Sequence, residues 1–473
     1  MHKVFLSVLL VFFNISLFSQ ECYDFLNDTA FVNASISFIV RDASGNDTIL
    51  EYDSGRSLKP ASVLKLFIAS AALEQLGPMH TFRTTLGYTG KITRSGRLSG
   101  DLVITGGGDP SFASPYFPEY YTNFPDGWIS EIKKLGIKRI KGRVITDDSY
   151  FDYLPLPSKW LWEDAGNYYG AGVYGTSVYD NTLKIHLRTT GAVPVITGIS
   201  PDGSEMQFIN RLKAEGTTDK GYVFAAPYSN SGWLAGSVPV NKEDFVLKAS
   251  ISDPPLFLAG ILHEKLISSG IKISGKPTTV RIEKKSTEHA TEISSIISPP
   301  LDSLLVILNH ESVNLYAETL LKELGKKLKN EGSVEAGIKA EYEFLRNAGV
   351  DTTGLFLADG SGLSPINGTT AGNLVSLLIY MSSKGKYFPE YLNSLPDAGK
   401  EGTLKRYFQD PAFAGSTKAK SGSMTRVKSY AGYITTFSGR KLVFAMIINN
   451  FSCAPARVNQ VFEEVLKELI MNK

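Results

Sequence analysis

The sequence contains few of the residues that most often bind metal ions. There are two cysteines, Cys22 and Cys453, and six histidines among 473 residues. Neither cysteine has another cysteine or a histidine at the spacing of a zinc site, and the His263-Glu264 pair has no second histidine four residues after the first. We therefore predict no metal centre and no cofactor.

Two cysteines also leave little scope for cross-links. In an oxidising compartment, Cys22 and Cys453 could form one disulfide that joins the two ends of the chain. The sequence does not fix the distance between them, so two free thiols are at least as well supported.

A surplus of charge of one sign is also missing. The chain has 49 lysines and arginines against 47 aspartates and glutamates, which gives a formal net charge of +2. No block of basic residues is interleaved with aromatic ones, so we expect no nucleic-acid partner. Hydrophobic residues at 43% and charged residues at 20% are typical of a globular protein, and the length allows two or three domains.

Long apolar runs are absent except at the N-terminus. A short positive start, residues 1–3, precedes an almost wholly apolar stretch at residues 4–18. This pattern predicts a cleaved secretory signal peptide over residues 1–19, with an uncleaved membrane anchor as the alternative. Gln20 and Glu21 are not the small residues that precede a lipidated cysteine. We expect an exported, soluble mature protein without a transmembrane segment.

The most informative stretch that is present covers residues 60–76. Its apolar residues recur with helical spacing, and the flanking prolines and glycine predict a helix with Ser62 in its first turn. Lys65 lies three residues later on the same face. A serine becomes a nucleophile when a base such as a lysine of lowered pKa takes its proton. The pair is weak evidence alone, because the spacing recurs elsewhere, for example at Ser130 and Lys133.

Two later segments carry similar chemistry. Ser312 and Asn314 lie in a break within a predicted helical region, residues 301–328, where a hydroxyl and a carboxamide can face one cleft, although such residues are usually helix caps. Lys420, Ser421 and Gly422 precede two predicted strands in the region 430–448. On an extended segment Lys420 and Gly422 share a face. The glycine lets a substrate backbone approach, and Lys420 with Ser421 can hold a carboxylate. A basic surface strand is the alternative interpretation.

Other elements can be placed more coarsely. Alternating apolar residues predict strands within residues 35–52, with Ile36, Phe38 and Val40 on one face, and a closing helix at residues 456–470. The aromatic-rich and glycine-rich stretch at residues 160–170 fits a saccharide or peptide groove and a packed loop equally well.

The three chemical segments occur in the order Ser-x-x-Lys, Ser-x-Asn, Lys-Ser-Gly, which resembles the signature of penicillin-recognising serine acyltransferases. Ser62 and Ser312 are 250 residues apart, far more than a compact β-lactamase needs. The chain resembles the D-alanyl-D-alanine carboxypeptidase/endopeptidase family, the low-molecular-mass class C penicillin-binding proteins. The likeness extends to segments at residues 100–110, 147–149, 302–325, 359–364 and 395–404.

The resemblance implies an α/β (α+β) architecture. It consists of a β-lactamase/transpeptidase-like domain with an antiparallel sheet flanked by helices, split between residues 20–85 and 293–473. Two mainly-β accessory domains are inserted at residues 86–292. Two positions depart from the family pattern: Ser421 stands where threonine is usual, and Pro365 stands where relatives often have an arginine.

The resemblance also implies a function. The chain is expected to be a periplasmic serine-type D-Ala-D-Ala carboxypeptidase or endopeptidase, which cleaves peptidoglycan stem peptides or cross-links and is acylated by β-lactam antibiotics. Ser62 is implied as the acylated nucleophile and Lys65 as its base. Ser312 would relay a proton with the help of Lys420.

The remaining motif positions are implied to bind substrate. Asn314 would hold a substrate amide, and Ser421 would bind the terminal carboxylate. Gly422 and Ser423 would form the strand segment beside the substrate, and the Ser423 N–H would be part of the oxyanion hole. Two alternatives remain: a β-lactamase or esterase on the same scaffold, and a non-catalytic peptidoglycan-binding protein.

Overall fold

The computed structural model describes residues 26–472 except 27, 46 and 288. The predicted signal peptide and Cys22 lie outside these residues, so the cleavage and the disulfide stay predictions. The chain forms two compact units. The first joins residues up to Gln75 with Leu305–Ser312 and Glu341–Lys473, and the second contains Leu76–Leu304 and Val313–Ala340. The predicted domain boundaries, including the division of the insertion into two domains, stay predictions.

A five-stranded antiparallel sheet forms the centre of the first unit. Its order is β19-β20-β21-β1-β2, so strands from the two ends of the chain pair side by side. Alternate residues of β1, among them Ile36, Phe38 and Val40, enter one apolar core, as the sequence predicts. Strands β1 and β21 are buried on both faces, and both faces therefore need a cover of helices. The strands are β1 (Ser35–Asp42), β2 (Thr48–Tyr52), β19 (Thr417–Met424), β20 (Val427–Thr435) and β21 (Lys441–Asn449).

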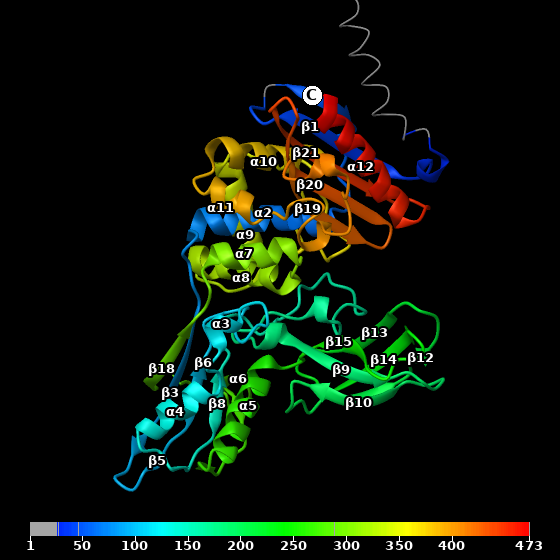
Figure 1. Cartoon of the computed structure of the whole chain (residues 1–473). Coiled ribbons are helices and arrows are strands. Elements are labelled where there is room, and N and C mark those ends of the chain that lie inside the picture. Colours follow the sequence, from blue (N-terminus) through cyan, green and yellow to red (C-terminus); the bar gives the residue numbers. More distant parts are fainter. Residues whose placement is uncertain (1–25, 27, 46, 288, 473) are drawn as a thin grey trace, which may run out of the picture. The chain divides into compact units, whose positions relative to one another are not determined.

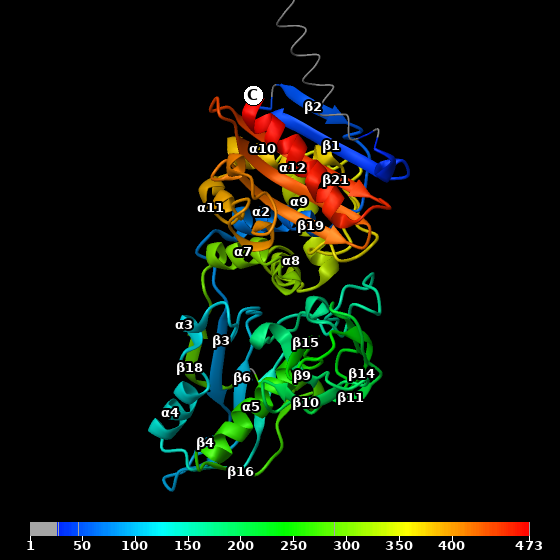
Figure 2. The same cartoon turned by 45° about the vertical axis from the view of Figure 1, so that its right-hand side comes forward.

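Helices cover this sheet on both faces (Figures 1 and 2). The C-terminal helix α12 (Pro455–Asn472) packs on the face that carries Phe38, and Cys453 lies against the same core. Helix α10 (Ala371–Lys384) packs against β21 and β1 from the opposite side. The predicted antiparallel sheet flanked by helices is thus confirmed. The other helices that contribute to this unit are η3 (Ala61–Leu64), α2 (Lys65–Leu76), α7 (Leu301–His310), α9 (Val334–Asn347) and α11 (Phe388–Asn393).

The second unit is built from four separate sheets. A mixed five-stranded sheet has the order β17-β8-β6-β3-β18, and a short four-stranded one has the order β16-β7-β5-β4. A three-stranded sheet, β10-β9-β15, and a four-stranded sheet of β11, β14, β12 and β13 complete it. Helix α5 (Pro254–Ser268) packs against β8 and β17.

The strands of the second unit are β3 (Arg83–Tyr88), β4 (Lys91–Ile92), β5 (Arg97–Ser99), β6 (Leu102–Thr105), β7 (Arg139–Ile140), β8 (Val144–Asp147), β9 (Thr182–Arg188), β10 (Val195–Ser200), β11 (Gln207–Asn210), β12 (Lys213–Ala214), β13 (Lys220–Ala225), β14 (Ser231–Val238), β15 (Phe245–Ser250), β16 (Lys272–Ile273), β17 (Thr278–Thr279) and β18 (Thr291–Ile297). Its further helices are α3 (Pro118–Tyr121), α4 (Asp126–Lys134), α6 (Val280–Glu283) and α8 (Asn314–Lys329).

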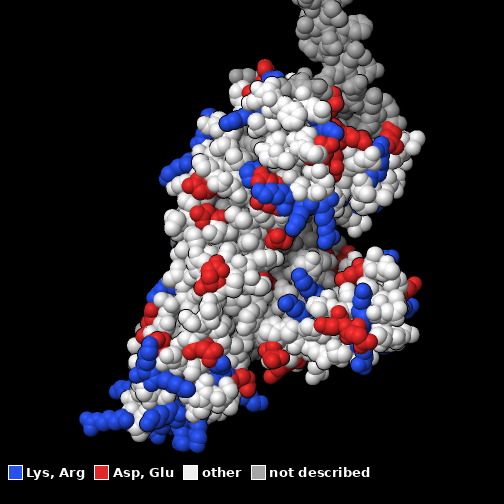
Figure 3. Space-filling model, in the orientation of Figure 1, with Lys and Arg blue, Asp and Glu red and all other residues white. Residues whose placement is uncertain are grey.

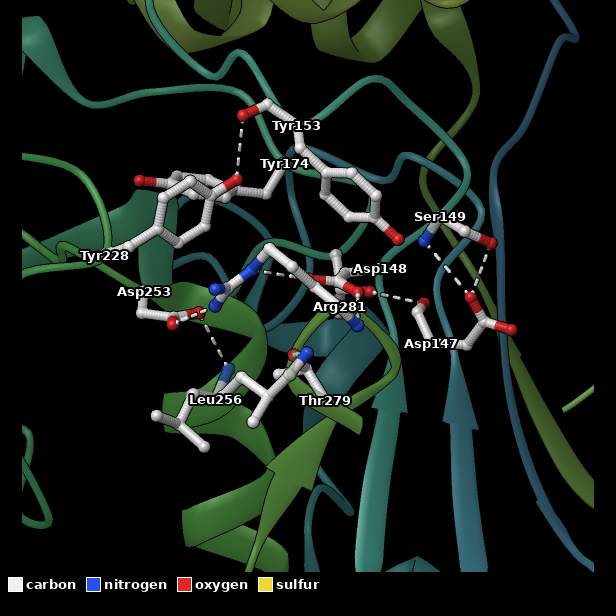
Figure 4. Close-up of polar contacts among 12 residues, drawn as sticks. Asp147, Asp148, Ser149, Tyr153, Tyr174, Tyr228, Asp253, Leu256, Thr279 and Arg281 are labelled. Atoms are coloured by element: carbon white, nitrogen blue, oxygen red, sulfur yellow. Dashed lines mark hydrogen bonds and ion pairs between the residues drawn. The ribbon is translucent and has the colours of Figure 1, made fainter. Parts of the chain in front are cut away.

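A partly buried arginine joins several elements of the second unit (Figure 4). Arg281 of α6 donates to Asp253, which caps the start of α5, and its Nε lies 3.5 Å from Oδ2 of Asp148, the residue after β8. Its guanidinium also lies 3.9 Å from the centre of the Tyr228 ring. Burial raises the pKa of Asp148 to about 6, although the charge of Arg281 opposes this shift. The cluster therefore depends on this one cation for its charge balance.

Within the part of the chain that the structure describes, no helix is both long and apolar enough to span a bilayer.

Candidate active site

Ser62 lies in a tight turn rather than in a regular α-helix. The predicted helix divides here: Ala61–Leu64 forms the 3-10 turn η3, and the α-helix α2 begins at Lys65. Ala61 has a φ of 49°, in the left-handed region that is unfavourable for a residue with a side chain. The carbonyl of Ala61 would lie 2.0 Å from a Cβ atom at Gly362, so only glycine allows that segment to close over the turn.

Lys65 is placed to act on the Ser62 hydroxyl. Its Nζ lies 2.9 Å from Oγ of Ser62 and donates to the carbonyl of Ser361 at 2.7 Å. The lysine is fully buried, whereas Ser62 is partly accessible. This geometry fits a nucleophile beside its base, and the Ser361 carbonyl fixes the direction of the amine.

A second lysine–serine pair has the same form. Nζ of Lys420, on β19, lies 3.0 Å from Oγ of Ser312 and 2.9 Å from the carbonyl of Ser421. Ser312 follows α7 and has a φ of 58°, so a strained residue presents the hydroxyl. Lys420 is fully buried. Both lysine–serine pairs belong to the first unit.

The two lysines influence each other. Burial holds the pKa of Lys420 well below its ordinary range; the positive charge of Lys65 lowers it further, and the carboxylate of Glu311 opposes both effects. Two interacting bases of this kind titrate as a pair. The site can therefore keep one amine neutral and ready to accept a proton.

Strand β19 packs directly against the turn that carries Ser62. A Cβ atom at Gly422 would lie 2.7 Å from the carbonyl of Pro60 and 3.0 Å from the backbone N of Ser62. Ser429, the partner of Gly422 on β20, donates to the same Pro60 carbonyl at 2.5 Å. The sequence predicts a glycine here to admit substrate. In the structure the glycine also admits the turn that carries Ser62.

The side chains of the other predicted positions do not join these contacts. Ser421 shares a hydrogen bond of 2.7 Å with Thr403, and Ser423 lies exposed on β19. Asn314 begins α8 in the second unit, where its Nδ2 donates to the carbonyl of Tyr169 at 2.8 Å. Tyr169 belongs to the aromatic stretch whose role the sequence leaves open.

Sequence reasoning assigned no role to three residues that support the site. Asp359 accepts from the backbone N–H groups of Gly362 and Ser364, at 2.8 and 2.6 Å, and so shapes the loop that offers the Ser361 carbonyl to Lys65. Ser361, which offers this carbonyl, is the second residue, and Thr403, which shares a hydrogen bond with Ser421, is the third. The only signal was their presence in segments shared with the family. Among the described residues, no group of three or more His, Cys, Asp or Glu side chains could hold a metal ion.

Comparison with known proteins agrees with this geometry. Residues 19–467 match the D-Ala-D-Ala carboxypeptidase 3 (S13) family, and this match covers nearly the whole chain. The chain belongs to this family. The predicted family and enzyme class, a serine-type D-Ala-D-Ala carboxypeptidase, are thereby confirmed.

Two curated relatives illustrate the match. The chain is 28% identical over 445 residues to the D-alanyl-D-alanine carboxypeptidase of Actinomadura sp. (strain R39), an alignment that covers 91% of this chain and 80% of that protein. It is 26% identical over 426 residues to the D-alanyl-D-alanine carboxypeptidase DacB of Haemophilus influenzae, with 89% and 86% covered.

Solved structures show the same fold. Penicillin-binding protein 4 of Haemophilus influenzae superimposes with a TM-score of 0.80 at 24% identity, over 97% of this chain and 99% of that one. A predatory peptidoglycan endopeptidase from Bdellovibrio bacteriovorus gives a TM-score of 0.50 at 20% identity, over 93% of each chain.

Proposed function

We propose that this family member removes the terminal D-alanine from peptidoglycan stem peptides in the periplasm, by way of an acyl-enzyme on Ser62. The observation that carries the proposal is the pair of buried lysines in one unit, each within 3.0 Å of a serine hydroxyl: Lys65 with Ser62 and Lys420 with Ser312. One pair supplies a nucleophile and its base, and the other supplies a second route for a proton.

The acylation step follows from these two pairs. Oγ of Ser62 bonds to the carbonyl carbon of the penultimate D-alanine while its proton passes to Lys65. The peptide C–N bond then breaks, and the departing D-alanine amine takes a proton from the hydroxyl of Ser312. Lys420 gives its own proton to Ser312 in turn. Lys65 gains one proton and Lys420 loses one, so the pair of lysines keeps its total charge. Hydrolysis by water returns the enzyme.

Substrate binding is assigned to the neighbouring motif positions. Backbone N–H groups of Ser62 and Ser423 would bind the developing oxyanion, a contribution of roughly 3–4 kcal/mol for each donor. Ser421, oriented by Thr403, would bind the terminal carboxylate. Asn314 would hold a substrate amide. We extend the proposal to endopeptidase cleavage of cross-links, because the scissile bond there has the same acyl donor.

Mass spectrometry with penicillin tests the nucleophile. Penicillin carries an acyl group that attacks the same site, so the intact mass of the chain should rise by one drug molecule, and the label should map to Ser62. Ser62→Ala should abolish labelling. Ser130→Ala serves as the matched control, since Ser130 has the same spacing to a lysine, and should label normally. An adduct that persists in Ser62→Ala would contradict the assignment.

Digestion of purified muropeptides then identifies the reaction. Release of free D-alanine from pentapeptides supports the carboxypeptidase, and conversion of dimers to monomers supports the endopeptidase. A penicillin adduct that hydrolyses rapidly, together with intact muropeptides, would show that the chain is a β-lactamase instead.

A further inference from the structure

Basic residues gather at one end of the second unit, far in sequence from the catalytic motifs. Three segments supply them, residues 91–97, 133–141 and 272–276, and none of the three contains an aspartate or glutamate. Their ten lysines and arginines are all exposed. In Figure 3 these side chains form the blue group at the lower left, over the part that carries β5 in Figure 1 and β4 and β16 in Figure 2. The residues of this basic tip are Lys91, Arg94, Arg97, Lys133, Lys134, Lys138, Arg139, Lys141, Lys272 and Lys276.

The sheet β16-β7-β5-β4 brings the three segments together. Lys272, Arg139 and Arg97 are register partners on three adjacent strands, so their side chains form a row on one face. The next register row is Ile273, Ile140 and Leu98; of these, Ile140 and Leu98 are fully buried. This small sheet therefore has one apolar face inside the unit and one cationic face toward solvent.

Nothing in the described chain neutralises this face. Lys134 pairs with Glu131 at 2.7 Å, and none of the other nine basic residues forms an ion pair among the described residues. Like charges directly opposite each other on neighbouring strands are destabilising. The protein nevertheless keeps these like charges together. Its formal net charge is only +2, so the positive charge of the tip is a local concentration and not part of a general excess. Such a patch fits a partner with many negative charges.

The composition of the tip indicates which kind of partner. The three segments contain no aromatic residue on which bases or sugar rings could stack. The uncharged side chains are mainly aliphatic, and Leu135, directly after two lysines at the end of α4, is 44% exposed. Cations around an exposed aliphatic residue suit the headgroup region of a bilayer. We propose that the basic tip binds the surface of a membrane rich in anionic phospholipids.

Vesicle co-sedimentation tests this proposal with the full exported chain. Wild type should sediment with vesicles of phosphatidylcholine mixed with phosphatidylglycerol, much more weakly with pure phosphatidylcholine, and less as salt increases. The triple variant Arg97→Gln, Arg139→Gln, Lys272→Gln removes the charged row. Because each basic residue near an anionic surface strengthens binding about fivefold, we expect the triple variant to bind about a hundredfold more weakly.

A matched control separates the tip from general charge. Lys213→Gln, Lys220→Gln, Lys242→Gln removes three exposed lysines of the same unit that form no ion pair among the described residues, and it should bind like wild type. Both triple variants should form the penicillin adduct and melt no lower than wild type, which shows that they fold. If the first variant folds poorly, Arg97→Gln and Lys272→Gln alone should each bind about fivefold more weakly.

Three results would overturn the proposal. The first is equal binding to anionic and neutral vesicles, and the second is undiminished binding by the triple variant. The third is preferential binding to inorganic polyphosphate or duplex DNA over anionic vesicles, which would make the partner a free polyanion.

Discussion

At the scale of single residues, the proposed chemistry depends on the protonation of two lysines, Lys65 and Lys420, that are both fully buried. Burial and the charge of Lys65 hold the pKa of Lys420 well below its ordinary range, and Lys420 contacts Ser312 as Lys65 contacts Ser62. A free lysine has a pKa near ~10.4, too high for a useful base at neutral pH. The fold lowers the proton affinity of the pair instead of supplying a histidine.

We predict that the rate of acylation by penicillin rises with pH through an apparent pKa below that of a free lysine. The sign follows because the base acts only after losing its proton, and the value belongs to the coupled pair. Lys65→Arg keeps the charge but cannot release its proton, so acylation should fall on the order of 10²–10⁴-fold. Lys420→Arg should lose less than Lys65→Arg, because it removes the proton relay to Ser312 but preserves the positive charge beside that hydroxyl.

The second-order acylation rate of wild type and both variants, measured across pH, checks this prediction. Near-normal acylation by Lys65→Arg would mean that lysine is not the base and that the proton of Ser62 leaves by another route.

At the scale of elements, the site depends on how closely β19 approaches the turn η3. Gly422 has no room for a side chain: a Cβ atom would lie 2.3 Å from Oγ of Ser429 and 3.0 Å from the backbone N of Ser62. The strand and the turn come from opposite ends of the chain, and their contact sets the position of Ser62 relative to Ser423.

Gly422→Ala should therefore impair acylation more than folding. Forcing the strand from the turn costs about 1–3 kcal/mol of unfolding free energy. A shift of the nucleophile by ~1 Å can reduce the rate ~10²-fold. Acylation kinetics and thermal unfolding measure the two effects. Gly55→Ala is the matched control in the same unit, since a Cβ atom there meets nothing within 4 Å. Equal behaviour of the two variants would refute the close-approach argument.

At the scale of the whole molecule, each compact unit is held together by a different structural feature. In the first unit it is the antiparallel sheet with helices on both faces. The second unit has four separate sheets, and a charged cluster links their ends: Arg281 joins Asp148 after β8 to Asp253 at the start of α5 (Figure 4). Asp148 is 2% exposed, so removal of the arginine leaves a buried carboxylate without its cation.

We predict that Arg281→Met destabilises the chain by about 3–5 kcal/mol at neutral pH, because it leaves the buried carboxylate of Asp148 as an uncompensated charge. Without the arginine, which lowers the pKa of Asp148, that pKa should rise above its value of about 6. The folded variant then favours the protonated carboxyl, so the penalty should shrink as the pH falls through this range.

Denaturant unfolding at neutral and mildly acidic pH checks both the size and the sign. Arg83→Met is the control. Its partner Glu292 is about half exposed, and loss of this surface pair should cost at most ~1 kcal/mol at either pH. An Arg281→Met penalty that does not depend on pH would indicate lost packing rather than unpaired charge.

Much of the proposed catalytic assignment was accessible from the sequence, because it rests on local spacing. Ser62 and Lys65 meet within one turn of chain, so three residues of separation suffice to predict their contact. Lys420 and Gly422 share a face because strand side chains alternate. The family follows from the order of three short motifs. The apolar alternation of Ile36, Phe38 and Val40 likewise predicts which face of β1 is buried.

Only the tertiary structure decided what depends on contacts between distant segments. The pairing of Lys420 with Ser312, the carbonyl of Ser361 on Lys65, and the bond of Thr403 to Ser421 join residues that no periodicity relates. The close approach of β19 and of the Gly362 segment to the turn that carries Ser62 likewise joins segments distant in sequence. The basic tip has the same origin. Its three segments are ordinary in sequence, and a cationic face exists only because backbone hydrogen bonding sets Lys272, Arg139 and Arg97 in one row.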